Sequence, residues 1–270
     1  MKILVCWKWV SLDAERIADP RWSGVSNADE AALETALTLA ASADPPATVH
    51  VVCVGSAAAD DALRTALAVG ADHVTRIDAS SELDSRVVAA ALAAHATDAD
   101  LVLCGDASVD RGTGSVPAFI ADELGCAQAL GLVSVEPQGP TFGSLRVTRR
   151  LDGGRREILD VDVPAVLSVE GAVARLRRAP MAASLATRRA EVATVTGPPG
   201  QPSEAEVQPY RPRTRAVAAP RGDSLERVRQ ILDVGGGDNH AELVTLDPPD
   251  AARRILEQLR DWGYLDAPDT

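Results

Sequence analysis

The residues best suited to chemistry lie in one loop, Gly105 to Val116, between an apolar run and a helical pattern. Its glycines let backbone N–H groups approach an anion, and the positive end of the following helix favours a phosphate there. Thr113 and Ser115 add hydroxyl donors, and Arg111 adds a counter-charge. The loop matches neither the G-x-G-x-x-G pattern nor a P-loop. It therefore indicates either a phosphate site or an ordinary surface loop.

A second polar segment, Ser26 to Glu30, opens the first helical pattern. Ser26 or Asn27 would cap the helix, and Asp29 and Glu30 would place acids in its first turn. This capping role accounts for the segment without any ligand. No second acid-base group can be placed beside the two carboxylates, so a glycosidase or protease active site has no support.

A basic run, Arg175 to Arg189, carries five arginines in a chain whose net charge is −12. Such a run is usually a solvated loop and helix. The alternative is a docking surface, because an exposed Met181 with arginines on both sides suits an adaptable partner site. The arginines are Arg175, Arg177, Arg178, Arg188 and Arg189.

Composition excludes several classes of protein. The negative charge argues against nonspecific binding to nucleic acid, which needs clustered Lys and Arg. No stretch is long and apolar enough to cross a bilayer, and the short apolar start is typical of a first strand rather than a signal peptide, so we expect a cytoplasmic protein. The cysteines and histidines share no metal-ligand spacing, which predicts buried, reduced thiols and no metal site.

Strand-like runs alternate with helical patterns over the first 130 residues, as in right-handed βαβ units with a parallel sheet. The expected strands are 3–7, 49–54, 74–77 and 101–104, and the expected helices are 29–41, 59–69, 86–96 and 115–124. Short strands at 132–135, 145–151 and 155–161 then surround an Asp-Gly-Gly turn, which indicates an antiparallel hairpin. A further strand is expected at 164–170.

These patterns predict two domains. Residues 1–196 form a Rossmann-like α/β domain: a mostly parallel sheet with a hairpin extension. Residues 197–270 form a C-terminal arm, because 197–222 is rich in Pro, Gly and charge and cannot build a core. Two helices follow, at 224–232 and 248–262; the second has Asp247 as N-cap and an apolar face that needs a partner.

Five motifs in one order resemble the β subunit of electron-transfer flavoproteins. They are MKILVCWK, SNADEAALETAL, LRTALAVGAD, LVLCGDASVDRGTGSVP and RRLDGGRREILDVDVPAVLSV, and together they span residues 1 to about 190. The tail, from Leu243 to the ILEQLRDWGYL stretch, resembles a divergent branch of this family that is found with the mycofactocin redox system.

The resemblance implies a Rossmann-like fold of the adenine-nucleotide α-hydrolase type, and an electron carrier without catalytic side chains of its own. It would form a heterodimer with a flavoprotein α subunit that holds most of the redox FAD, and would receive electrons from a flavin-dependent dehydrogenase. A structural AMP would lie in the β subunit, at positions that match these residues: Cys6, Ser26, Asn27, Ala28, Asp29, Val54, Gly105, Asp110, Arg111, Gly112, Thr113, Gly114, Ser115 and Val116. The docking loop would include Met181, Arg177, Arg178, Arg188 and Arg189.

This chain departs from the family at several of these positions. Ser26-Asn27-Ala28 replaces Asn-Pro-Phe, Ala107-Ser108-Val109 replaces Gln-Ala-Ile, and Gly112 and Ser115 replace an acid and a glutamine. AMP, FAD and an empty site therefore remain alternatives for the cavity.

Two other functions stay open from the sequence. An adenylating or nucleotide-hydrolysing enzyme would need a glycine-rich loop after the first strand, where the chain reads Cys6-Trp7-Lys8-Trp9. An ATP- or AMP-binding sensor of the universal-stress type would lack the 130–190 extension and the tail, and would form homodimers.

Overall fold

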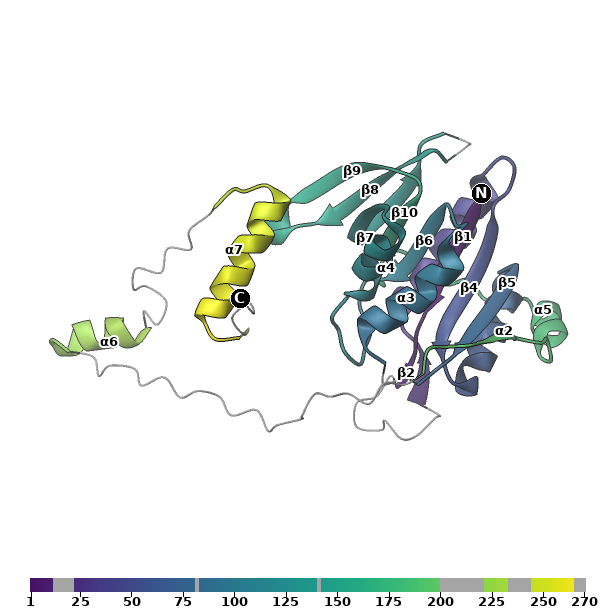
Figure 1. Ribbon diagram of the computed structural model, residues 1–270, viewed down its shortest axis with the longest axis horizontal. Coiled ribbons are helices and arrows are strands. Elements are labelled where there is room, and N and C mark those ends of the chain that lie inside the picture. The colour runs from purple at the N-terminus through teal and green to yellow at the C-terminus, as the bar shows by residue number, and fades with distance from the viewer. Residues whose placement is uncertain (12–21, 81–82, 140–141, 200–220, 233–243, 265–270) are drawn as a thin grey trace, which may run out of the picture. The chain divides into compact units, whose positions relative to one another are not determined.

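The computed structural model describes residues 1–11, 22–80, 83–139, 142–199, 221–232 and 244–264 (Figure 1). The chain divides into two compact units, Met1–Ala205 and Glu206–Thr270. Most of the predicted linker lies outside the described residues, and so do Leu243 and Leu265 of the tail.

One nine-stranded sheet forms the centre of the first unit, in the order β11-β5-β4-β1-β6-β10-β7-β8-β9. Six neighbouring pairs, from β11 to β7, are parallel, and the last two pairs are antiparallel. This confirms the predicted Rossmann-like fold with an antiparallel extension. The strands are β1 (Lys2–Trp7), β4 (Thr48–Gly55), β5 (His73–Asp78), β6 (Leu101–Gly105), β7 (Ala127–Pro137), β8 (Ser144–Arg150), β9 (Arg156–Asp162), β10 (Ala165–Val169) and β11 (Ala193–Thr196).

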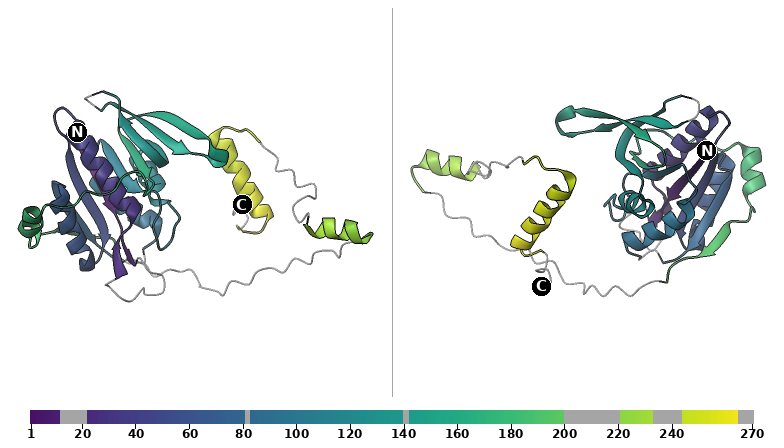
Figure 2. Two further views of the ribbon diagram at one scale, coloured as in Figure 1. Left: turned by 180° about the vertical axis from the view of Figure 1, so that it is seen from behind. Right: turned by 45° about the horizontal axis from the view of Figure 1, so that its top comes forward.

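Helices cover both faces of the sheet and bury two separate apolar clusters. Helices α1 and α2 pack on the face that carries Ile3 and Val5, whereas α3 and α4 pack on the face that carries Leu4 and Cys6. The α3–α4 pair lies in front of the sheet in Figure 1, and the reverse view in Figure 2 brings α1 to the front. The bounds are α1 (Asn27–Ser42), α2 (Asp60–Val69), α3 (Ser85–Ala96), α4 (Val116–Leu124) and α5 (Met181–Thr187).

Local capping residues mark the ends of three of these helices. The Ser26 hydroxyl accepts a hydrogen bond from the Asp29 backbone N–H at 3.1 Å and so caps α1. Gly70 and Gly125 end α2 and α4 with positive φ angles, which an L side chain adopts only under strain.

The antiparallel extension is the hairpin of β8 and β9, which continues from β7. Gly153 and Gly154 turn the chain between its strands with φ angles of +69° and +75°. β2 (Trp9–Ser11) and β3 (Ser23–Val25) form a small separate antiparallel ribbon. In the sequence, β2 follows soon after the end of β1.

The described residues of the second unit form two helices, α6 (Ser224–Leu232) and α7 (Pro248–Asp261). Asp247 caps α7 through a 2.9 Å hydrogen bond from the Asp250 N–H, as predicted. No residue of α7 is buried, and Ile255, Leu256 and Trp262 are exposed. Among the described residues, no helix is both long enough and apolar enough to span a bilayer.

Candidate functional site

A partly open cavity of about 110 Å³ lies at the carboxyl ends of β1, β4 and β6. Ligands of open α/β sheets bind at such an edge. When cavity volume is measured in this way, one water molecule needs about 10–15 Å³. The cavity therefore has room for several waters or for a ring system. Its lining residues are Cys6, Trp7, Lys8, Trp9, Asp29, Val54, Ser80, Ser85, Val88, Leu92, Cys104, Gly105, Ala107, Ser108, Arg111, Thr113, Gly114, Ser115, Val116 and Pro117.

Asp29 is the buried carboxyl group of this cavity. It lies in the first turn of α1 and accepts hydrogen bonds from the backbone N–H groups of Lys8 and Gly105, each at 3.3 Å. Its own backbone carbonyl accepts a hydrogen bond from the Trp7 indole at 2.8 Å. Burial raises the pKa of Asp29 to about 7, although the hydrogen bonds oppose that rise. The cavity therefore contains a carboxyl group that titrates near neutral pH.

Gly105 allows α1 to approach the end of β6. A Cβ atom at this position would lie 2.6 Å from Asp29 Oδ1 and 2.9 Å from the Asp29 backbone nitrogen. Gly114 is required in a different way, because its φ is +58° and a Cβ would lie 2.5 Å from the Asp106 carbonyl oxygen. Both glycines let the backbone of the 105–116 loop fold tightly beside the cavity.

Charged side chains fasten this loop to the rest of the domain. The Lys8 ammonium group lies 2.7 Å from both carboxylate oxygens of Asp110. This pair lowers the pKa of Asp110, although partial burial alone would raise it. Arg111 donates a 2.9 Å hydrogen bond to the Leu83 carbonyl oxygen. The two contacts join the loop to the chain after β1 and to the chain before α3.

The loop ends at the N-terminus of α4 without a side-chain cap. Ser115 makes no capping hydrogen bond, and its hydroxyl lies 3.1 Å from that of Thr113. Two hydroxyl groups and the positive end of a nine-residue helix therefore lie together at the cavity.

The structure brings together nine of the fourteen residues predicted for nucleotide binding: Cys6, Asp29, Val54, Gly105, Arg111, Thr113, Gly114, Ser115 and Val116. Ser26, Asn27 and Ala28 line a neighbouring shallow hollow, which shares Ala107 and Ser108 with the cavity. Asp110 and Gly112 line neither hollow, although Asp110 pairs with Lys8.

Sequence reasoning proposed as site residues neither the residues just after β1 nor those of α3 and the connection before it. Lys8 and Trp9 follow β1 directly, a position that could have pointed to them. Val88 and Leu92 belong to the apolar face of α3. Ser85 is the first residue of that helix, and Ser80 lies in the connection before it. The residues of α3 and of the preceding connection reach the cavity only because of the way α3 crosses the sheet.

Cys6, Cys53 and Cys104 are buried, as predicted, whereas Cys126 is only partly buried; none of the four forms a disulfide. Cys6 and Cys104 are partners in register on β1 and β6. The Cys6 neighbour and burial raise the pKa of Cys104 well above its usual value, which keeps that thiol protonated. Among the described residues, no group of three His, Cys, Asp or Glu side chains could hold a metal ion.

The predicted docking residues lie around α5. Met181 and Leu185, one turn apart, are 75% and 63% exposed. The side chains of Arg178, Arg188 and Arg189 are also exposed. Arg177 differs from them, because its guanidinium pairs with Glu34 of α1 at 2.8 Å.

Sequence comparisons relate this chain to known proteins. The electron transfer flavoprotein domain matches residues 17–199. The electron transfer flavoprotein subunit beta of Syntrophomonas wolfei is 33% identical over 204 residues, which cover 72% of this chain and 79% of that protein.

Two further relatives match over shorter stretches. The subunit beta of Methylophilus methylotrophus is 30% identical, covering 53% of this chain and 55% of that protein. Protein FixA of Azorhizobium caulinodans is 31% identical, covering 53% of this chain and 54% of that protein. The chain thus spans about half the length of these two relatives. A family domain that matches most of the chain, together with the Syntrophomonas relative, shows that the chain belongs to the electron transfer flavoprotein family, among its β subunits.

Proposed function

We propose that this chain is the β subunit of a heterodimeric electron-transfer flavoprotein that relays electrons from a flavin-dependent dehydrogenase to a downstream acceptor. FAD, held mainly by the α subunit, would supply the electron-carrying chemistry when bound. The residues of this chain would bind a nucleotide and dock partners, without a catalytic side chain. The observation that carries the proposal is the cavity at the carboxyl ends of β1, β4 and β6, in a chain of this family.

The cavity residues fit an adenine nucleotide. Val54, Val88 and Leu92 offer apolar contacts for a base, and Trp9 offers an aromatic ring. The uncapped start of α4, with its two hydroxyl groups, suits a phosphate. We assign AMP to this cavity as a structural ligand. FAD in its place is the other outcome that an experiment must distinguish.

The exposed apolar pair of α5 supports docking of the donor dehydrogenase. Met181 and Leu185 lie on one helix face, and exposed arginines follow the helix. A surface of this kind fits a partner with an apolar pocket and an acidic rim. The tail would instead clasp the α subunit, because the apolar residues of α7 are exposed. The resemblance of that tail to the mycofactocin branch points to a dehydrogenase of that system as the donor.

The test is to coexpress the chain with candidate flavoprotein α subunits and to measure the size and absorbance spectrum of the product. We expect a one-to-one heterodimer with flavin bands. Heating should release FAD and an equal amount of AMP, identified by chromatography; FAD in twice that amount, without AMP, would place FAD in the cavity. A colourless homodimer that binds ATP without a partner would contradict the proposed function.

A further inference from the structure

Helix α5 lies on a long connection between distant parts of the sheet. The chain leaves β10, between β6 and β7, and returns to the sheet as β11, beside β5 at the edge. Between the two strands, α5 packs against α2, yet none of its seven residues is buried. A helix of this length is unstable alone. Contacts on its flanks must therefore hold it in place.

The flank before α5 is fastened to α1 by Arg177 and Glu34. The Arg177 backbone N–H donates to Glu34 Oε2 at 3.0 Å, and its guanidinium donates Nε–H and Nη2–H to the same carboxylate at 2.8 to 3.2 Å. The Glu34 side chain is only 15% exposed. A bidentate pair with a further backbone hydrogen bond fixes both the position and the direction of this flank.

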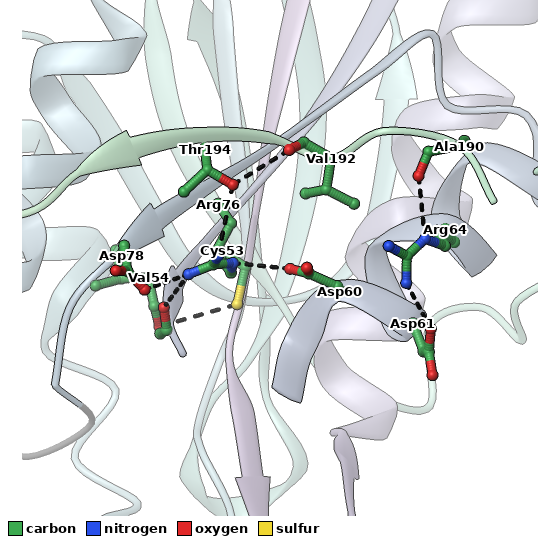
Figure 3. Close-up of polar contacts among 11 residues, drawn as sticks. Cys53, Val54, Asp60, Asp61, Arg64, Arg76, Asp78, Ala190, Val192 and Thr194 are labelled. Carbon is green, nitrogen blue, oxygen red and sulfur yellow. Dashed lines mark hydrogen bonds and ion pairs between the residues drawn. The ribbon is translucent and has the colours of Figure 1, made fainter. Parts of the chain in front are cut away.

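The flank after α5 is fastened to α2 by Arg64 (Figure 3). Arg64 Nε–H donates to the Ala190 carbonyl oxygen at 3.1 Å, and its Nη1 lies 2.6 Å from Asp61 on the same helix. Two residues later Val192 is buried in the core, and β11 then pairs with β5. The contact from Arg64 thus fixes the last free turn before the chain enters the sheet.

Arg76 strengthens the same edge from inside the sheet. Its buried guanidinium pairs with Asp60 at 2.7 Å and with Asp78, and its Nη2 lies 3.5 Å from the Thr194 hydroxyl of β11 (Figure 3). Arg64 and Asp60 belong to α2, so one helix start holds both the α5 flank and the β5 edge.

We propose that Arg64 and the Glu34–Arg177 pair are positioning residues that present α5 to the donor dehydrogenase. They act on the orientation of Met181 and Leu185 and do not touch the partner. This assigns a role to Arg64 of the LRTALAVGAD motif, which the nucleotide cavity does not use. The inference rests on the proposed docking function of α5. Its structural half, the anchoring of the helix, can be tested independently of docking.

The first measurement is hydrogen exchange of the intact heterodimer, comparing wild type with Arg64→Met and Glu34→Gln. Loss of one such hydrogen bond should speed exchange of the amides in residues 183–190 by about fivefold. Exchange in β1 and β6 should not change. Asp61→Asn is the matched control, because it removes the exposed ion pair but leaves the Arg64–Ala190 hydrogen bond. Equal protection of α5 in Arg64→Met, Glu34→Gln and wild type would overturn the inference.

The second measurement is reduction of the heterodimer by the dehydrogenase that reduces the wild type. Arg64→Met should raise the KM for the heterodimer severalfold and leave kcat unchanged, since the flavin site is untouched. Met181→Ser with Leu185→Ser tests docking itself and should raise KM further. If the double serine variant has the wild-type KM, α5 does not dock the dehydrogenase. The hydrogen-exchange result then tests the anchoring of α5 independently. If the serine pair raises KM but Arg64→Met does not, positioning is wrong and docking stands.

Arg64→Lys replaces the first variant if Arg64→Met does not fold. It keeps the positive charge but removes the Nε–H donor, so exchange of residues 183–190 should still rise above that of Asp61→Asn. Exchange equal to that of the control would again contradict the anchoring.

Discussion

Asp29 takes part in the cap of α1 through its backbone N–H, and its carboxyl group contacts the chain after β1 and the end of β6. Its two oxygens accept separate backbone N–H groups, while burial opposes its negative charge. The folded protein therefore holds the proton more tightly than the unfolded chain does. The stability that this brings is complete at pH values below the unfolded pKa, near 3.8, and is lost as the pH rises through about 7.

Asp29→Asn should flatten the pH dependence of stability between about pH 5.5 and pH 8. Over that range, the free energy of unfolding of the wild type should fall relative to that of the variant by about 2 kcal/mol. Urea titrations of both proteins at several pH values measure this difference. The variant should be less stable overall, since its amide NH₂ faces a backbone N–H. Parallel profiles for the two proteins would show that Asp29 does not titrate in this range.

Gly105→Ala should destabilise the domain by about 1–3 kcal/mol, the usual cost of overpacking. The new methyl group would meet the Asp29 carboxylate, which accepts two backbone hydrogen bonds, and the α1 backbone, which the Ser26 cap holds. Gly55→Ala at the end of β4 is the control, because a Cβ there meets nothing within 4 Å. Thermal unfolding compares the two variants, and equal melting temperatures would refute the close approach.

Individual residues show where sequence reasoning succeeds and where it stops. Gly114 and Thr113 could be predicted because a glycine-rich strand-to-helix loop has its own chemistry. Leu92 and Ser80 could not, because they reach the cavity only through the crossing of α3 over the sheet. The pairing of Arg177 with Glu34 was equally hidden, since 143 residues separate the partners.

Among the elements, α1 carries the cap on which the cavity depends. Ser26→Ala should remove the hydrogen bond to the Asp29 N–H and lower the free energy of unfolding by about 1 kcal/mol. Ser42→Ala, at the exposed far end of the same helix, should change it by much less. Chemical unfolding of the two variants gives the comparison; a loss for Ser42→Ala as large as that for Ser26→Ala would contradict the capping role.

Most elements could be predicted because their patterns are local. Buried parallel strands read as continuous apolar runs, and β1 and β6 follow this rule. By contrast β11, with the sequence ATVT, lies at an edge with Thr and Ala mostly exposed, and its identity comes from pairing with β5. The β2–β3 ribbon pairs three residues on each side and shows no alternation long enough to detect.

At the scale of the whole molecule, the exposed apolar side chains of α7 should become buried when the heterodimer forms. Trp262 is 60% exposed in this chain, and Ile255 and Leu256 of α7 are exposed as well. Binding of the α subunit should therefore shift the fluorescence of Trp262 to shorter wavelength. The shift is measured as the difference between wild type and Trp262→Phe, because three other tryptophans contribute. A heterodimer that forms with identical shifts in both proteins would place α7 outside the interface.

The described residues that line the cavity all lie between Cys6 and Pro117, whereas β10 enters the sheet from residues 165–169. During synthesis, the ribosome therefore releases every one of these lining residues before the strand that separates β6 from β7. Until β10 arrives, β6 has a free edge beside the unfinished cavity. A nucleotide that binds to the cavity before β10 is synthesised would stabilise this half of the sheet. It would thereby oppose incorrect strand pairing at the free edge of β6.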